Sequence, residues 1–189
     1  MIIALDFETS GTDPRVNAPV SIGVALMEGE EVIDIRHKII APPMYKGKIT
    51  KTYDVCALEI SGLTWEEIKG GQSATAVLFD LSAWSLMHDA KRLPVVAYNA
   101  PFDLSFYSEL LFMGRIWNNY TKSFQRAKPP FVGPWQCALM MAVDSLDLDA
   151  YSLDAVADHF GLARSSEKHN ALDDAILAGK IYAKLTEAA

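Results

Sequence analysis

The sequence predicts a single α/β domain, and two observations predict it. Residues 1–40 contain three apolar or alternating segments joined by short polar turns, which favours three neighbouring antiparallel strands. Residues 94–98 form a short apolar run that leads directly into a segment with helical spacing, an order typical of α/β folds. A chain of 189 residues is long enough for one domain with a sizeable core, whereas two domains would be cramped.

The first expected strand covers residues 1–8 and ends in two acids. Alternate positions of a strand point to the same face, so Asp6 and Glu8 should lie side by side. The opposite face is apolar and contains Ile3, Leu5 and Phe7. Two carboxylates this close either repel each other or hold cations. The alternative is that they only mark the end of a strand before a polar turn.

The second and third strands are expected over residues 18–27 and 31–40. Residues 41–53 are basic and rich in turn formers, which predicts an exposed loop. The nearest approach to a basic patch in the sequence includes this loop and contains Lys38, Lys46, Lys48 and Lys51. A solvated loop without a ligand is the alternative interpretation of these lysines.

The second half of the chain should be mainly helical. Capping residues and helical spacing predict helices from Thr64, over residues 73–88, after Asn99, over 137–142 and over 152–160. The stretch 118–135 is irregular and is expected to be a long loop. A final amphipathic helix should follow residues 165–174 and run to about Leu185.

Composition narrows the class of protein. The formal charge of −7 argues against a protein that coats nucleic acid through a general positive field, although a nucleic-acid enzyme stays compatible with it. No apolar run approaches the roughly 20 residues of a membrane span, and no basic segment precedes the first apolar run. A cytoplasmic protein is therefore expected. The two cysteines are too few for a disulfide framework and have no companion at metal-ligand spacing.

Three acidic segments resemble one known family. They read Leu-Asp-Phe-Glu-Thr-Ser-Gly over residues 5–11, Tyr-Asn-Ala-Pro-Phe-Asp over 98–103 and His-Asn-Ala-Leu-Asp-Asp over 169–174. In order and form they resemble the motifs of the DEDD superfamily of 3′–5′ exonucleases, in its DnaQ-like DEDDh branch. The resemblance spans residues 5 to 174. It implies an RNase H-like fold, in which a central mixed five-stranded sheet is flanked by helices, with antiparallel strands 1–3 followed by parallel strands.

The resemblance also implies the catalytic residues, which are Asp6, Glu8, Asp103, His169 and Asp174. The four acids would bind metal, and the family spacing from the histidine selects Asp174 over its neighbour Asp173. Four carboxylates suit two hard cations, and Mg²⁺ or Mn²⁺ fit this ligand set better than zinc does. The family mechanism implies two metals about 3.5–4 Å apart, with Asp6 bridging them, that activate a water and stabilise the leaving 3′ oxygen. His169 would take the proton from the attacking water.

The implied substrate is the 3′ end of a single-stranded or frayed nucleic acid, with DNA favoured over RNA. Candidate substrate contacts, chosen by their proximity to the motifs, are Phe7, Thr9, Ser10, Gly11, Leu63, Trp65, Asn99 and Phe102. A DNA polymerase could act as partner in trans. The alternatives are trimming of RNA 3′ ends and a non-catalytic interaction module on the same fold. The chain departs from the family pattern at Tyr98, which replaces a histidine, and at Pro101 within the second motif, and neither position supplies a required acid. Ser61 also replaces a histidine, in a segment that bears on substrate preference rather than on chemistry.

Overall fold

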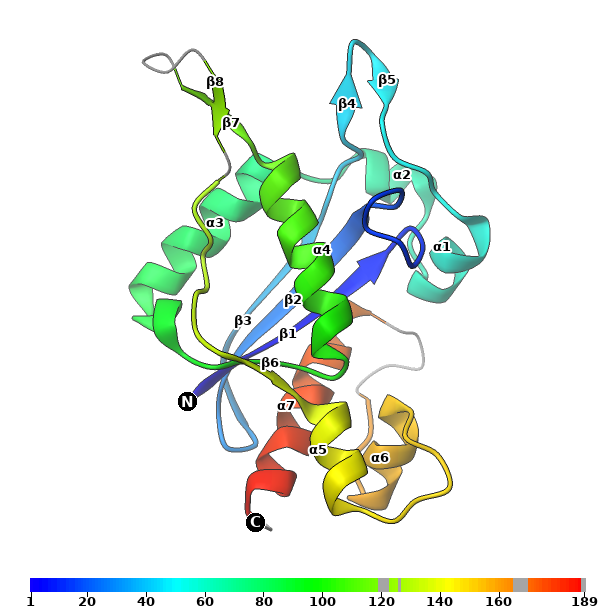
Figure 1. Ribbon diagram of the computed structural model, residues 1–189, viewed down its shortest axis with the longest axis vertical. Coiled ribbons are helices and arrows are strands. Elements are labelled where there is room, and N and C mark those ends of the chain that lie inside the picture. Colours follow the sequence, from blue (N-terminus) through cyan, green and yellow to red (C-terminus); the bar gives the residue numbers. More distant parts are fainter. Residues whose placement is uncertain (119–122, 126, 165–169, 188–189) are drawn as a thin grey trace.

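The computed structural model describes residues 1–118, 123–125, 127–164 and 170–187. Its centre is a five-stranded sheet with the strand order β3-β2-β1-β6-β9 (Figure 1). The strands are β1 (Ile2–Thr9), β2 (Pro19–Glu28), β3 (Glu31–Ile39), β6 (Val95–Ala97) and β9 (Trp135–Cys137). β1, β2 and β3 pair antiparallel, whereas β6 runs parallel to β1 and β9 runs parallel to β6. The predicted mixed sheet is thereby confirmed.

Helices cover both faces of this sheet (Figure 1). They are α1 (Val55–Ser61), α2 (Trp65–Lys69), α3 (Ala74–Met87), the 3-10 helix η1 (Ala90–Arg92), α4 (Ala100–Met113), α5 (Ala138–Ser145), α6 (Leu153–His159) and α7 (Ala171–Glu187). Two small hairpins project from the domain, β4 (Met44–Tyr45) with β5 (Lys48–Ile49) and β7 (Ile116–Asn118) with β8 (Ser123–Gln125). Among the described residues, the helices are too short or too polar to cross a bilayer.

The alternation along β1 divides the core into two layers. Ile3, Leu5 and Phe7 pack with apolar residues of α3 and α4 on one face. Ile2 and Ala4 belong to a separate cluster on the opposite face, against which α7 packs. Asp6 and Glu8 continue the α7 side of the strand, as their spacing predicts. The carboxylates therefore emerge where β1 passes beneath the start of α7.

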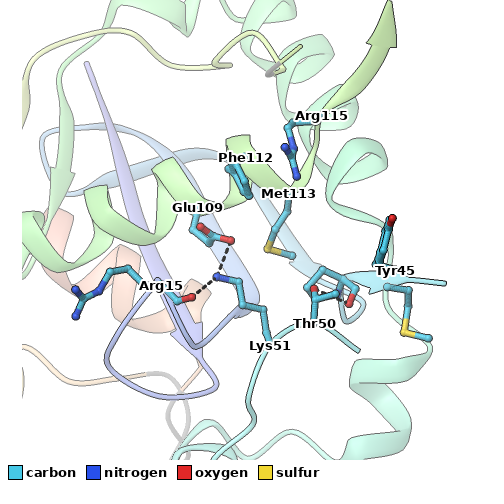
Figure 2. A pocket seen from close by; sticks show the side chains of 10 residues that line it. Arg15, Tyr45, Thr50, Lys51, Glu109, Phe112, Met113 and Arg115 are labelled. Carbon is cyan, nitrogen blue, oxygen red and sulfur yellow. Dashed lines mark hydrogen bonds and ion pairs between the residues drawn. The ribbon is translucent and has the colours of Figure 1, made fainter. Parts of the chain in front are cut away.

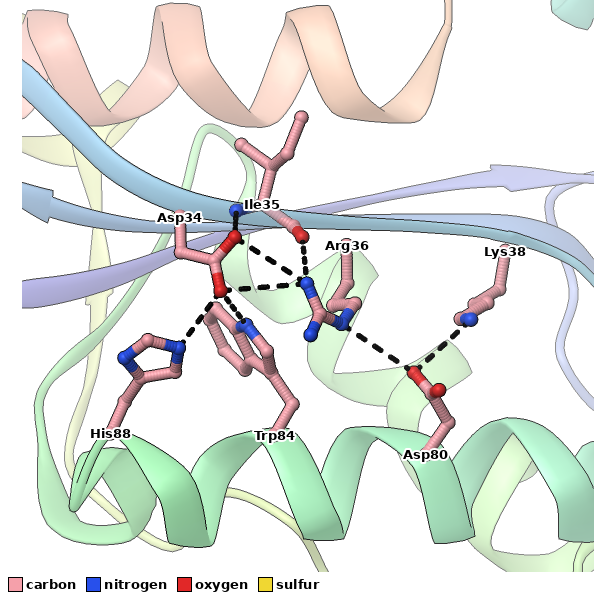
Figure 3. Close-up of polar contacts among 7 residues, drawn as sticks. All are labelled: Asp34, Ile35, Arg36, Lys38, Asp80, Trp84 and His88. Carbon is pink, nitrogen blue, oxygen red and sulfur yellow. Dashed lines mark hydrogen bonds and ion pairs between the residues drawn. The ribbon is translucent and has the colours of Figure 1, made fainter.

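A polar network holds α3 against β3 (Figure 3). The Asp34 Oδ2 of β3 accepts a hydrogen bond of 2.7 Å from the Trp84 indole N–H. The same oxygen lies 2.8 Å from the His88 Nε2. The bond from Trp84 is the main cause that lowers the pKa of Asp34 below its usual value. Lys38 of the expected basic patch forms an ion pair with Asp80 of α3 at 3.2 Å. Lys38 is therefore part of this network.

Close packing of β2 against α7 fixes where α7 begins. Gly23 of β2 lies beneath the first residue of α7, and a Cβ atom at Gly23 would come 2.2 Å from the carbonyl oxygen of Ala171. Only a residue without a side chain allows this approach. Because Asp174 is in the first turn of α7, the contact at Gly23 sets the height of Asp174 above the sheet.

Several element predictions were wrong in detail. The expected loop over residues 41–53 contains the β4–β5 hairpin, and the expected long loop over 118–135 contains β8 and the first residue of the edge strand β9. The helix expected from Cys137 starts at Ala138, because Cys137 is still paired with β6. By contrast, the capping box of Thr64 and Glu67 at the start of α2 is confirmed.

Candidate active site

Three acids from two distant parts of the chain meet at the end of β1. Carboxylate oxygens of Asp6, Glu8 and Asp174 all lie within 4.8 Å of one another. β1 supplies the first two on one face, and the first turn of α7 supplies the third. Asp174 is buried, whereas Asp6 and Glu8 are partly exposed. A ligand can therefore approach the cluster from the side of Asp6 and Glu8, whereas α7 covers the side of Asp174.

Asp103 approaches the same strand end from α4. Its carboxylate accepts a hydrogen bond of 3.2 Å from the backbone N–H of Phe7, the residue between the two β1 acids. Asp103 is buried, with 2% of its surface exposed. Burial raises the pKa of Asp103 to about 8; the hydrogen bond from Phe7 opposes this rise and the charge of Glu8 adds to it. Asp103 thus adjoins the three-carboxylate cluster and interacts electrostatically with it.

Mutual repulsion makes this group of acids unfavourable without a cation. Burial raises the pKa of Asp6 well above its usual value, and the negative charges of Asp103, Glu8 and Asp174 raise it further. Oxygen ligands at this spacing, all from carboxylates, match the chemistry of a hard divalent cation such as Mg²⁺ or Mn²⁺. The residues present therefore fit the metal ions that the family resemblance implies.

Arg164 is a member of the site that the sequence reasoning missed. Its guanidinium Nε lies 2.5 Å from one carboxylate oxygen of Asp174, and its Nη1 contacts Asp154 at the start of α6. Burial lowers the pKa of Arg164, but hydrogen bonds to these two acids outweigh it and raise this pKa overall. The positive charge of Arg164 acts to lower the pKa of Asp6. No motif marks Arg164, because its contact with Asp174 is a tertiary contact between residues that share no helix or strand.

The structure separates the two neighbouring acids of α7. Asp174 faces the cluster, while Asp173 bonds to Asn170, which donates from its side-chain amide at 2.7 Å. The charge of Asp173 acts on His37 of β3 instead, where it opposes the lowering of the His37 pKa by burial. His169, the expected proton acceptor, lies outside the described residues, so its role stays a prediction.

Two of the expected substrate contacts are used inside the protein. Phe7 is 4% exposed and packs in the core, so its ring is not available for stacking on a base. Ser10 is fully buried; its hydroxyl donates to the Thr52 carbonyl at 2.6 Å and its own N–H donates to the Ala18 carbonyl. We therefore assign Phe7 and Ser10 to packing and to the turn after β1.

Other predicted contacts keep exposed surface near this turn. Thr9 is partly exposed and donates its hydroxyl to the Gly11 carbonyl at 2.7 Å, and Gly11 has a positive φ of 149°, in the region that favours glycine. The remaining predicted contacts are partly or fully exposed, and they are Leu63, Trp65, Asn99 and Phe102. Their exposure leaves these side chains available to a ligand.

Two of the departures from the family pattern, Tyr98 and Ser61, have structural contacts. The Tyr98 hydroxyl donates to the Tyr151 carbonyl at 2.6 Å, which ties the end of β6 to the segment before α6. The Ser61 hydroxyl donates to the Leu58 carbonyl at 2.9 Å within α1. Both side chains are buried, so each one stabilises the fold at its position.

Sequence comparisons agree with this arrangement. The family model described as "Exonuclease" (RNase_T) matches residues 3–182. A DNA polymerase III PolC-type from Thermotoga maritima is 29% identical over 185 residues, which are 98% of this chain and 12% of that protein. A DNA polymerase III subunit epsilon from Rickettsia felis is 27% identical over 190 residues, covering 97% of this chain and 73% of that protein. The chain thus spans about an eighth of the PolC-type relative.

Solved structures show the same fold. The nuclease domain of 3′hExo, a DEDDh family member bound to rAMP, superposes with a TM-score of 0.76 at 15% identity, covering 99% of this chain and 92% of that one. Exonuclease X in complex with 5′ overhanging duplex DNA superposes with a TM-score of 0.69 at 16% identity, covering 100% and 93%. Because the family match extends over nearly the whole chain, the resemblance is confirmed, and the chain belongs to the RNase_T exonuclease family.

Proposed function

We propose that this chain is a divalent-metal-dependent 3′–5′ exonuclease that removes nucleoside 5′-monophosphates from single-stranded or frayed DNA. The observation that supports this proposal most directly is the cluster of Asp6, Glu8 and Asp174, with Asp103 beside it. Four acids at the end of one strand, in a protein of the exonuclease family, suit the hydrolysis of a phosphodiester bond.

Each acid has a distinct structural position that suits a role as metal ligand. The charges of the other three acids all act on Asp6, so Asp6 would gain most from a bound cation and is our first candidate for a metal ligand. Glu8 extends the same strand face, while Asp103 and Asp174 bring carboxylates from α4 and α7. Bound ions would supply Lewis-acid stabilisation of the charge that develops on the phosphate. His169 would accept a proton from the attacking water, as the family motif implies.

The relatives favour DNA as substrate and a polymerase as partner. The two sequence relatives are named as polymerase III components. We therefore propose that the chain acts on DNA 3′ ends in the cytoplasm, together with a polymerase that is either a separate protein or a further part of the same polypeptide. Degradation of RNA 3′ ends is the alternative that the test must separate, since the 3′hExo domain is described with bound rAMP.

Digestion of matched labelled strands tests the proposal. DNA and RNA of one sequence, each labelled at the 5′ end, should be incubated with Mg²⁺ or Mn²⁺ and resolved on a sequencing gel. We expect a ladder that shortens from the 3′ end, faster for DNA, and its loss when EDTA is present. Faster degradation of RNA would reverse the substrate assignment. Failure to degrade either strand would contradict the enzymatic proposal.

A further inference from the structure

Ser21 of β2 has a buried hydroxyl that forms no hydrogen bond within the described part of the chain. The residue is 1% exposed, so bulk water does not reach this hydroxyl. A hydroxyl that loses water without gaining a partner destabilises the folded state relative to an apolar side chain of similar size. Buried groups of this kind are rare in folded proteins and often belong to functional sites.

Other buried oxygens with this property are explained by their surroundings. Among the described residues, oxygens without a hydrogen bond also occur in Tyr53, Asp80 and Glu109. Figure 2 shows the Glu109 carboxylate of α4 beside the Lys51 ammonium, with which it forms an ion pair of 2.9 Å. Asp80 likewise forms an ion pair with a lysine of β3 (Figure 3). Tyr53 lies outside the central sheet, between β5 and α1. Ser21, by contrast, is part of the sheet that carries the acids.

The register of the sheet places Ser21 beside the candidate active site. Ser21 pairs directly with Glu8 of β1. Gly23, two residues further along β2, pairs with Asp6. Paired residues of antiparallel strands point to the same face, with Cβ atoms about 4.5–5.5 Å apart. The Ser21 side chain is therefore on the same face as both acids of β1, and rotation about side-chain bonds brings its hydroxyl within reach of the Glu8 carboxylate.

Two other acids of the site already accept hydrogen bonds from neighbouring elements. Asp103 accepts one from a backbone N–H of β1, and Asp174 accepts one from Arg164. Carboxylates that bind metal ions are regularly oriented by such bonds from groups that do not themselves touch the ion. Ser21 can act on Glu8 in the same way, from the strand next to it.

We propose that Ser21 is a positioning residue for Glu8, and that its hydroxyl donates a hydrogen bond to the Glu8 carboxylate when this carboxylate binds a divalent ion. This inference rests on the proposed function. Because Ser21 is shielded from water, a hydrogen bond formed there is stronger than the same bond in solvent. Ser21 thus favours ion binding and lowers the stability of the ion-free protein.

Urea unfolding in EDTA tests the effect on the ion-free protein. Ser21→Ala removes the unpartnered hydroxyl and should leave the urea midpoint unchanged or raise it. Ser85 of α3 offers a matched control, because it is also 1% exposed but donates its hydroxyl to the Pro130 carbonyl at 2.9 Å. Ser85→Ala should lower the midpoint, since the buried carbonyl loses its donor.

Calorimetric titration with Mn²⁺ tests the effect on ion binding. Ser21→Ala should weaken Mn²⁺ binding about tenfold, the lower end of the loss that follows when a hydrogen-bond partner of a metal ligand is removed. Ser21→Cys keeps a similar shape with only a weak donor, so it should weaken binding as well. Ser85→Ala should bind Mn²⁺ within about twofold of the wild type.

The possible results separate this inference from the proposed function. Equal Mn²⁺ affinity in the wild type and both Ser21 variants would overturn the inference and leave the metal centre in place. A urea midpoint in EDTA that falls as far for Ser21→Ala as for Ser85→Ala would overturn it too, because the hydroxyl would then already be bonded. Mn²⁺ binding that is unchanged in Asp6→Asn would overturn the metal centre on which both proposals rest. A wild type that binds Mn²⁺ but degrades no strand would overturn the exonuclease proposal, and the titrations would still decide the role of Ser21.

Discussion

At the scale of single residues, the site depends on backbone contacts as much as on the acids themselves. The Phe7 N–H lies between Asp6 and Glu8 in the chain and donates to Asp103, so a backbone group of β1 places an acid of α4. Spacing in the sequence predicts that Asp6 and Glu8 share a face, and the cluster with Asp174 agrees with this. The same spacing cannot predict Arg164, because its contact with Asp174 joins residues ten positions apart that share no single helix or strand.

The raised pKa of Asp103 predicts how stability depends on pH when divalent ions are absent. The pKa is about 8 in the folded protein and about 3.9 in an unfolded chain. Between these values the folded state binds more protons than the unfolded state, so the free energy of unfolding should fall as the pH rises from about 4 to about 8. The raised pKa of Asp6 acts in the same direction.

Urea unfolding in EDTA, at several pH values across this interval, measures the effect. The Asp103→Asn variant lacks the titrating group and should show a weaker decline in stability than the wild type. Wild-type protein whose stability increased over the same interval would show that the buried acids do not titrate as proposed.

Neighbouring acids of α7 offer a matched pair for testing the site assignment. Asp174→Asn should lower turnover of a labelled DNA strand by more than about 100-fold, because it removes a carboxylate from the proposed metal centre. Asp173→Asn removes the same charge one residue away, where the side chain bonds to Asn170, and should change turnover by less than about threefold. Similar losses in both variants would mean that Asp174 has no special role.

At the scale of elements, strong local patterns were predictable and short edge elements were not. The alternation of β1, the capping box of α2 and the extent of α3 all follow from side chains within each segment. β9 has only three residues, and its hydrogen bonds come from β6, which lies far away in sequence. A strand this short carries too little periodicity to be distinguished from a loop. Its position at the sheet edge is set by the tertiary structure.

The contact between β2 and α7 leads to a prediction about Gly23. A methyl group at this position would meet the Ala171 carbonyl, so Gly23→Ala should destabilise the protein by about 3 kcal/mol and lift the start of α7 from the sheet. Because Asp174 moves with that helix turn, the variant should also bind Mn²⁺ more weakly. Chemical unfolding and calorimetric titration measure the two effects.

Gly29→Ala is a suitable control for this prediction. Gly29 has a φ of 58° and no neighbouring atom within 4 Å, so only backbone strain of about 1 kcal/mol is expected, with no change in metal affinity. If the two variants were equally stable and bound Mn²⁺ equally, close packing at Gly23 would not position the site.

At the scale of the whole molecule, the fold gathers negative charge at one end of β1. β1, α4 and α7 come from the beginning, middle and end of the chain, and each contributes acids to the same place. A chain with a net negative charge can therefore bind a polyanion if cations neutralise these acids.

Neutralisation of the acids should also be visible in global stability. A ligand that binds only the folded state at 100 times its Kd stabilises it by about 2.7 kcal/mol. Saturating Mn²⁺ should therefore raise the melting temperature of the wild type by several degrees and that of Asp6→Asn by much less. Differential scanning calorimetry with and without EDTA measures this difference. Equal shifts in both proteins would place the stabilising ions elsewhere.

The most direct measurement is anomalous diffraction at the manganese edge, from crystals grown with Mn²⁺ and a nucleoside 5′-monophosphate. The account predicts manganese peaks bound by carboxylate oxygens of Asp6, Glu8 and Asp174, with Asp103 in contact with the same centre. It also predicts that the phosphate of the nucleotide lies against these ions. Well-ordered crystals with Mn²⁺ at other positions, and none among these carboxylates, would contradict the proposed metal centre and the exonuclease mechanism built on it.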